Sequence, residues 1–230
     1  MFKSNLCLYC STPMMASYSW ATFSWSYQKP LLCTSCEGKL APISGTTCSI
    51  CSRELPTAEV LCQDCSRWEQ DGRWKGILGK NTSLYHYNDF MKELIALYKY
   101  RGDTALAEVF AGPLKKCLSV YKEALIVPIP LSDERLMERG FNQSEQLILK
   151  AGCKPVHLLA RIHSEKQSKK TRRQRLELPQ IFQFKSSSPI EGKQIVLVDD
   201  IYTTGSTLRH AAEILLESGA SSVHSLTVAR

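Results

Sequence analysis

The chain has 230 residues, of which 43% are hydrophobic, and it carries a net charge of +7. This length allows one core of ordinary size plus a small appended module. No stretch approaches the roughly 18 consecutive apolar residues of a membrane span, and the first residues hold no apolar run of signal-peptide length. The composition therefore excludes a membrane-inserted protein, and we expect a cytoplasmic chain whose thiols stay reduced.

Cysteines are concentrated at the start of the chain. Eight of the ten lie in the first 65 residues, as four Cys-x-x-Cys pairs. Two such thiolate pairs complete a tetrahedral Zn²⁺ site that is structural, because it leaves no open position for catalysis. Pairing of neighbouring pairs and pairing of interleaved pairs both satisfy this requirement, so the sequence predicts two zinc sites without choosing their partners. The predicted ligands are Cys7, Cys10, Cys33, Cys36, Cys48, Cys51, Cys62 and Cys65.

The change in composition near residue 75 predicts two domains, a zinc-binding module over 1–75 and a second domain over 76–230. The second domain begins with an expected strand at 83–88 (SLYHYN) and an expected helix at 89–100, for which Asp89 is a suitable cap. A second helix follows at 103–123, with Pro113 as a potential kink.

The next segments continue the alternation. Residues 124–130 (ALIVPIP) form a short apolar run that is typical of a strand. A helix is expected from about Glu134 to 152, broken or loosened at Gly140. Arg135 and Arg139 lie in this region, directly after the expected strand.

The positive charge is concentrated in one segment. Residues 1–78 carry a net charge of +1 and residues 79–230 a net charge of +6, and residues 161–175 (RIHSEKQSKKTRRQR) by themselves carry +6. Such local basicity indicates an anionic partner such as nucleic acid or phosphate, although a solvated loop is the alternative. The candidate nucleic-acid-binding residues are Lys169, Lys170, Arg172, Arg173 and Arg175.

The last elements complete an α/β pattern. IVLVDD at 195–200 is a continuous apolar run that is typical of a strand buried on both faces of a parallel sheet. A helix is expected at 207–219, and a final strand at 221–230. Strands that alternate with helices in this order predict a parallel sheet flanked by helices, behind the N-terminal cysteine-rich module.

Two acidic residues and a hydroxyl-rich turn lie between the strand at 195–200 and the helix at 207–219. The backbone N–H groups of such a turn, together with the positive end of the following helix, form an anion cradle. Adjacent carboxylates would repel a bare phosphate, but they accept hydrogen bonds from the vicinal hydroxyls of a sugar. The pattern therefore predicts a site for ribose plus phosphate. Its residues are Asp199, Asp200, Thr203, Thr204, Gly205, Ser206 and Thr207.

The stretch VLVDDIYTTGST resembles the phosphoribosyl-pyrophosphate (PRPP) motif of type I phosphoribosyltransferases. This resemblance implies that Asp199 and Asp200 bind the ribose 2′ and 3′ hydroxyls and that Thr203–Thr207 holds the 5′-phosphate. It also implies a pyrophosphate-binding loop after IVPIP, with Arg135 and Arg139 as candidates, and Mg²⁺ bound together with PRPP. The sequence departs from the family in lacking an evident hood for an acceptor base.

A narrower resemblance covers almost the whole chain. YKYRGD at 98–103, VPIPLSDERLMERGFNQSEQL at 127–147 and the PRPP motif, behind the cysteine module, are similar to the ComF/ComFC late-competence family. The resemblance implies handling of incoming single-stranded DNA during natural transformation, with the ComFA helicase/translocase and other DNA-processing proteins as partners. It also implies recruitment to the inner face of the membrane. The alternative function is phosphoribosyl transfer to an unidentified nucleobase or nucleotide-like acceptor.

Overall fold

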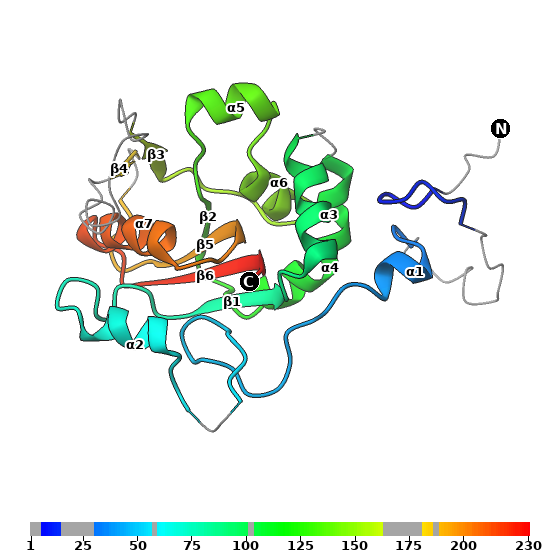
Figure 1. Ribbon diagram of the computed structural model, residues 1–230. Coiled ribbons are helices and arrows are strands. Elements are labelled where there is room, and N and C mark those ends of the chain that lie inside the picture. Colours follow the sequence, from blue (N-terminus) through cyan, green and yellow to red (C-terminus); the bar gives the residue numbers. More distant parts are fainter. Residues whose placement is uncertain (1–5, 15–29, 57–58, 101–103, 163–180, 186–188) are drawn as a thin grey trace, which may run out of the picture.

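A parallel sheet lies at the centre of the molecule (Figure 1). This computed structural model describes residues 6–14, 30–56, 59–100, 104–162, 181–185 and 189–230. The sheet has the order β1-β6-β5-β2, and every neighbouring pair of strands is parallel. Its strands are β1 (Asn81–Tyr85), β2 (Leu125–Pro128), β5 (Gln194–Ile201) and β6 (Ser222–Ala229).

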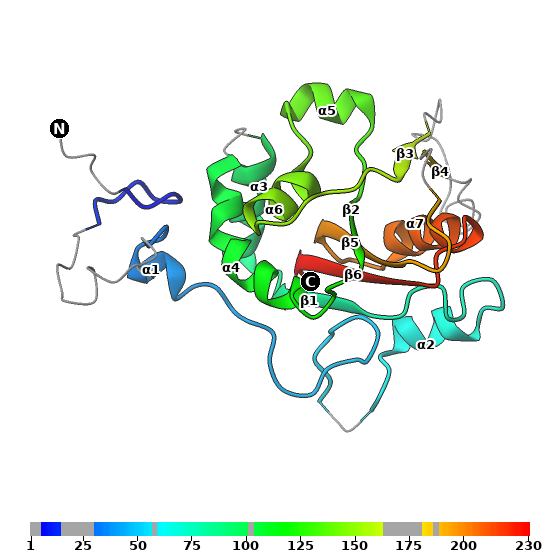
Figure 2. The ribbon, with the colours of Figure 1, turned by 180° about the vertical axis from the view of Figure 1, so that it is seen from behind.

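Helices cover both faces of this sheet, as Figures 1 and 2 show. One face carries α3 (Asp89–Tyr100), α4 (Ala107–Leu118) and α6 (Gln143–Lys150), and the other carries α7 (Ser206–Glu217). Side chains alternate along β5, so that Val196 and Val198 join the first core and Ile195 and Leu197 the second. The expected parallel sheet with helices on both faces is therefore confirmed.

Gly140 divides the long helix that was expected to loosen there. Helix α5 (Asp133–Arg139) ends at this glycine, whose φ of 75° is left-handed. Helix α6 then begins behind Asn142, whose side chain accepts hydrogen bonds from the backbone N–H groups of Ser144 and Glu145. Helix α5 has no buried residue, and it stands beyond the end of β2 (Figure 1).

Three other elements differ from the expected pattern. The segment expected as one helix over 103–123 forms a 3₁₀ turn, η2 (Thr104–Leu106), followed by α4, which contains Pro113. An antiparallel pair, β3 (Leu159–Arg161) and β4 (Phe182–Phe184), was not expected from the sequence. Three residues are too few to display the period-two pattern of a strand.

The two halves of the cysteine-rich module lie on opposite sides of the sheet (Figures 1 and 2). The first half, with α1 (Thr34–Glu37), contributes to the core that contains α3 and α4. The second half, with α2 (Gln63–Gln70), contributes to the core that contains α7. Among the described residues, no helix has the length and apolarity that a membrane crossing requires.

Candidate functional site

The hydroxyl-rich turn connects the end of β5 to the start of α7. Gly205 is the residue before the helix and has a left-handed φ of 79°, which glycine adopts without strain. The first N–H groups of α7 have no partner within the helix, so they point toward the turn with the positive end of the helix dipole. Thr203 and Thr204 are exposed, and Ser206 and Thr207 are half-buried. We call this turn the phosphate loop (203–207), after the ligand that the sequence predicts for it.

At Gly205 the phosphate loop packs against two buried side chains, those of Tyr202 and Arg209. A Cβ atom added to Gly205 would lie 2.1 Å from the Tyr202 hydroxyl oxygen and 2.4 Å from Arg209 Nη1. Arg209 Nη1 donates a hydrogen bond of 3.0 Å to that hydroxyl. Any side chain at position 205 would therefore collide with the Tyr202 hydroxyl and the Arg209 guanidinium.

The two adjacent carboxylates have different surroundings. Asp200 is 9% exposed and pairs with Lys99 of α3 at 2.7 Å between Nζ and Oδ2. Asp199 Oδ1 instead accepts a hydrogen bond of 3.2 Å from Ser144 Oγ and one of 2.9 Å from the Asp200 backbone N–H. Among the described residues, a cation lies at contact distance from Asp200 but not from Asp199.

These surroundings shift the pKa of Asp199 upward. Burial has the largest effect, and the neighbouring Asp200 adds to it; hydrogen bonds and Lys99 oppose both but are weaker. Burial and Asp200 outweigh the opposing effects and raise the pKa of Asp199 to about 7. The carboxyl group therefore changes its charge near neutral pH, and its ionised form is the better acceptor for two sugar hydroxyls.

Two arginines, Arg135 and Arg161, lie close to each other and to Asp199. Burial lowers the pKa of Arg161, at the end of β3, and the nearby Arg135 lowers it further, whereas Asp199 opposes both. Two cations close to one another and to a carboxylate form a place where an anionic ligand would be stabilised. Arg139 Nη1 donates a 2.7 Å hydrogen bond to Gln143 Oε1, and its guanidinium lies 5.7 Å from the Tyr100 ring centre.

Three of the residues in this site were not singled out by sequence reasoning. Lys99 lies in the YKYRGD motif, where it had no assigned role, and Ser144 lies in the segment 127–147, also without one. Arg161 was counted in the basic segment rather than in the phosphoribosyl site. The other basic-segment candidates, Lys169, Lys170, Arg172, Arg173 and Arg175, lie outside the described residues.

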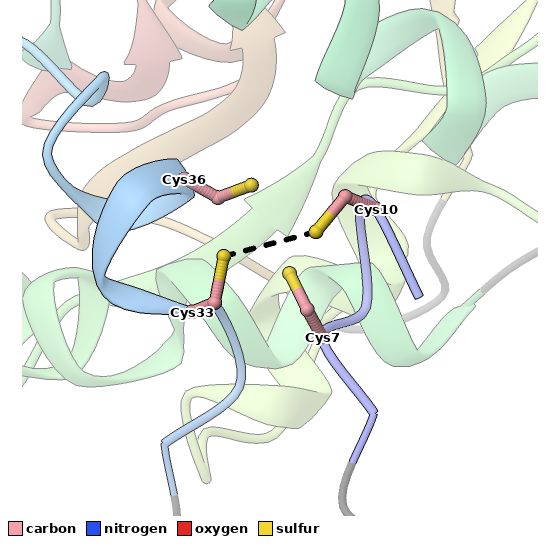
Figure 3. Close-up of side chains that lie close together, drawn as sticks. All are labelled: Cys7, Cys10, Cys33 and Cys36. Atoms are coloured by element: carbon pink, nitrogen blue, oxygen red, sulfur yellow. Dashed lines mark hydrogen bonds between the residues drawn. The ribbon is translucent and has the colours of Figure 1, made fainter. Parts of the chain in front are cut away.

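Neighbouring Cys-x-x-Cys pairs come together, so the interleaved pairing is excluded. In the first cluster, the thiols of Cys7, Cys10, Cys33 and Cys36 all lie within 4.8 Å of one another and converge on one point (Figure 3). The Sγ atoms of Cys10 and Cys33 are 3.7 Å apart. Cys7 and Cys36 are buried, whereas Cys10 is exposed. Four convergent thiols fit a tetrahedral zinc ion.

The second cluster is fully buried. Cys48, Cys51, Cys62 and Cys65 also lie within 4.8 Å of one another. Burial raises the pKa of Cys48, but the backbone N–H groups around it have the larger combined effect and lower the pKa to about 7. One of them, the Cys62 N–H, donates a 3.4 Å hydrogen bond to Cys48 Sγ. Four buried, convergent thiols also fit a structural zinc ion.

The comparisons with known proteins agree with these features. The family described as phosphoribosyl transferase domain matches residues 83–230. The chain is 40% identical to the competence protein ComFC of Bacillus subtilis over 98% of its own length and 95% of that protein. It is 39% identical to ComFC of Streptococcus pneumoniae over 86% and 87% of the two chains. It is also 27% identical to the DNA utilization protein YhgH of Escherichia coli, over 84% and 94%.

Proposed function

The chain belongs to the ComFC family of competence proteins and contains a phosphoribosyl transferase domain, and on this premise we propose that it handles incoming single-stranded DNA on a PRPP-binding scaffold. The observation that carries the proposal is the 40% identity to a competence protein over 98% of the chain. The DNA utilization protein among its relatives supports the same class of role.

The phosphate loop supports the PRPP part of the proposal. Its backbone N–H groups and hydroxyls would hold the 5′-phosphate, and Asp199 and Asp200 would accept hydrogen bonds from the ribose hydroxyls. Arg135 and Arg139, together with Arg161, would bind the pyrophosphate group. Mg²⁺, when bound with PRPP, neutralises the negative charge of the pyrophosphate. The residues of the chain itself position and hold the sugar, the phosphate and the pyrophosphate.

Several finer features remain part of the proposal. Two zinc ions, one for each cysteine cluster, would hold the module over 1–75, which is too small to fold on a hydrophobic core by itself. The basic segment at 161–175 would bind the phosphates of a single strand. The partners would include the ComFA helicase/translocase and other DNA-processing proteins, and the protein would act in the cytoplasm, at the inner face of the membrane.

Ligand binding tests the PRPP part directly. Calorimetry with PRPP and with ribose 5-phosphate should give saturable binding to the wild-type chain. The paired substitution Asp199→Ala with Asp200→Ala should weaken both ligands but should not weaken inorganic phosphate, which has no ribose hydroxyls and is no longer repelled by the two carboxylates. Equal affinity of the double variant and the wild type for ribose 5-phosphate would refute the site.

A second experiment separates binding from turnover. Pyrophosphate release from PRPP would be followed in the presence of Mg²⁺, with and without single-stranded DNA and with a panel of bases. Release that requires an added base would favour the alternative function as a phosphoribosyltransferase. Binding of PRPP and single strands without release would favour a DNA-handling role on an inactive scaffold.

A further inference from the structure

Helix α2 connects the second cysteine cluster to the phosphate loop. Cys62 is the residue before the helix and Cys65 lies in its first turn, so the helix carries two of the four thiols. Trp68 follows Cys65 by three residues, which places both on the same side of the helix. Its Nε1–H donates a hydrogen bond of 3.0 Å to the Thr204 carbonyl oxygen. One turn of helix thus separates a predicted zinc ligand from the phosphate loop.

A buried arginine, Arg209, packs against both the Trp68 ring and Gly205 of the loop. Arg209 is 0% exposed, and its guanidinium lies 4.7 Å from the Trp68 ring centre. One of its nitrogens binds the Tyr202 hydroxyl, but Nε and Nη2 have no hydrogen-bond partner among the described residues. A buried cation with unpaired donors is costly. Because Arg209 lies against the phosphate loop, however, its positive charge would favour a bound phosphate.

Further contacts attach the same module to α7, the helix whose start forms the cradle. Arg73 donates two hydrogen bonds to Glu213, of 2.7 and 2.9 Å. The Trp74 ring lies 4.7 Å from the His210 ring, in an edge-to-face arrangement. The position of α2 relative to α7 is therefore fixed at several points, and Trp68 lies within that contact.

The first cysteine cluster has no comparable contact with the loop in the described part of the chain. It is attached to α3 instead, through Tyr9, whose ring lies 4.8 Å from that of Phe90 and whose hydroxyl donates to Glu93. Helix α3 covers the face of the sheet opposite to α7 (Figure 1). The chain therefore contains a matched control, in which a second metal cluster contacts the same domain away from the site.

We propose that Trp68 and Arg209 are positioning residues through which the second cysteine cluster holds the phosphate loop in its binding geometry. Trp68 fixes the Thr204 carbonyl, and Arg209 packs against Gly205 of the loop and supplies positive charge. The proposal rests on the proposed phosphoribosyl-binding function. It implies that the second cluster, and not the first, is required for phosphate binding.

Three substitutions in the zinc-loaded full chain test the proposal. Trp68→Phe keeps an aromatic ring against Arg209 but removes the donor to Thr204, and should weaken ribose 5-phosphate binding about fivefold. Arg209→Met removes the buried charge and should weaken binding roughly tenfold or more, whereas Arg209→Lys should restore part of it. The control Tyr9→Phe removes one hydrogen bond at the first cluster and should leave binding unchanged. Zinc content and thermal unfolding are measured for every variant.

A pH profile separates a positioning role from a general loss of structure. Methyl phosphate lacks ribose hydroxyls, and a phosphate monoester takes its second charge near pH 6. Asp199 ionises in the same pH range and would repel the dianion, so the profile is measured in an Asp199→Asn background. In that background the affinity for methyl phosphate should rise between pH 5.5 and 7.5, because Arg209 favours the dianion. In Arg209→Met this rise should be smaller, whereas a merely loosened loop would weaken binding equally at both pH values.

Metal removal provides an independent test. The first cluster has an exposed cysteine and the second is fully buried, so a mild chelator should remove the first zinc before the second. Ribose 5-phosphate binding should survive loss of the first zinc, and loss of binding together with the first zinc would contradict the proposal.

The possible outcomes distinguish the two proposals. If the wild type binds ribose 5-phosphate and both Trp68→Phe and Arg209→Met bind it equally well, the positioning role is wrong while the proposed function stands. If the wild type binds neither ribose 5-phosphate nor methyl phosphate, the proposed site falls and this inference falls with it. Should Arg209→Met fail to fold, Trp68→Phe and the chelation series decide the question.

Discussion

At the scale of single residues, the site is defined by two adjacent carboxylates with different partners. Asp200 has the ammonium group of Lys99 at 2.7 Å, while the described residues that contact Asp199 offer it two hydrogen-bond donors, the Ser144 hydroxyl and the Asp200 N–H. Asp200 lies in an ion pair, whereas burial and the neighbouring carboxylate raise the pKa of Asp199 to about 7. Environment rather than residue type thus separates the two roles.

The raised pKa of Asp199 predicts a pH-dependent stability. Its folded pKa of about 7 exceeds the ordinary value of about 3.9, so the folded chain retains a proton that the unfolded chain releases. Stability is therefore lost as the pH rises from about 4 to about 7. Asp199→Asn should raise the Tm by several degrees at pH 8, since each kcal/mol shifts Tm by roughly 2–4 °C.

The gain should shrink as the pH falls toward 4, where the wild-type carboxyl group is also neutral. Asparagine retains an oxygen that can accept from Ser144 and from the Asp200 N–H, so Asp199→Ala serves as the control that loses both bonds. Thermal unfolding of the ligand-free chain across this range provides the measurement. A Tm difference that does not change with pH would contradict the assigned titration.

At the scale of elements, two left-handed glycines end or begin helices but differ in their surroundings. Gly140 closes α5 with a φ of 75°, and a Cβ there would meet no atom of the described chain within 4 Å. Gly205 precedes α7 with a similar φ, but a Cβ there would collide with Tyr202 and Arg209. Position 140 requires glycine only because of its left-handed φ, whereas position 205 requires glycine also because no side chain would fit there.

A matched pair of alanine substitutions tests this distinction. Gly140→Ala should cost about 1–2 kcal/mol of stability, the usual cost of a left-handed conformation, and leave phosphate binding intact. Gly205→Ala should cost more, because Tyr202 and Arg209 must move, and should abolish ribose 5-phosphate binding. Denaturant unfolding and calorimetry on both variants provide the comparison. Similar binding by the two variants would argue against the packing of the phosphate loop on Arg209.

At the scale of the whole molecule, the cysteine-rich module lies on both faces of the sheet. Its first cluster joins the core of α3 and α4, and its second cluster joins the core of α7. The side chains of the module and of the following domain therefore form shared cores. The proposed domain boundary near residue 75 therefore separates two parts of the chain, 1–75 and 76–230, whose side chains pack against each other.

Metal analysis should find two zinc ions per chain, and single substitutions should distinguish the clusters. Cys48 is 0% exposed and lies in the core, so Cys48→Ser should lose one zinc and unfold or aggregate the chain. A zinc site in a small module is worth on the order of 10 kcal/mol. Cys10 is exposed, and Cys10→Ser should lose the other zinc with a smaller fall in Tm. Fewer than one zinc per purified chain would rule out both sites.

DNA binding is expected to depend on the basic segment. Replacing its five candidate residues with glutamine should lower the log–log salt slope for single strands by about 0.7 for each phosphate group that the chain no longer neutralises. Sequence preference should hardly change, because binding to phosphates does not specify bases. The five residues are Lys169, Lys170, Arg172, Arg173 and Arg175.

A control variant removes positive charge elsewhere on the molecule. Lys115, Lys116 and Lys122 are exposed near the end of α4, and their replacement with glutamine should leave the salt slope nearly unchanged. Fluorescence anisotropy with a labelled single strand at several salt concentrations measures both variants. If the five-site variant retains wild-type affinity and slope, another surface must bind DNA.

The sequence by itself determined the features that depend on short stretches of chain. Apolar runs predicted β2 and β5, helical spacing predicted α3 with its bounds of 89–100, and Cys-x-x-Cys spacing predicted metal ligands. The strand expected at 83–88 is displaced toward the N-terminus, since β1 covers Asn81–Tyr85. The Asp-Asp and Thr-Thr-Gly-Ser-Thr pattern predicted a cradle between β5 and α7. These features follow from local periodicity and from the chemistry of neighbouring side chains.

Only the tertiary structure decided which distant residues meet. It chose neighbouring over interleaved cysteine pairs, placed Lys99 against Asp200, and brought Trp68 to the carbonyl of Thr204, 136 positions later. Each of these contacts depends on how elements pack across the sheet, and no periodicity within one segment encodes that arrangement. The cradle could be predicted from the sequence because its atoms come from one turn. The side chains that contact the turn or the adjacent carboxylates, Trp68, Lys99 and Ser144, come from three other elements, α2, α3 and α6.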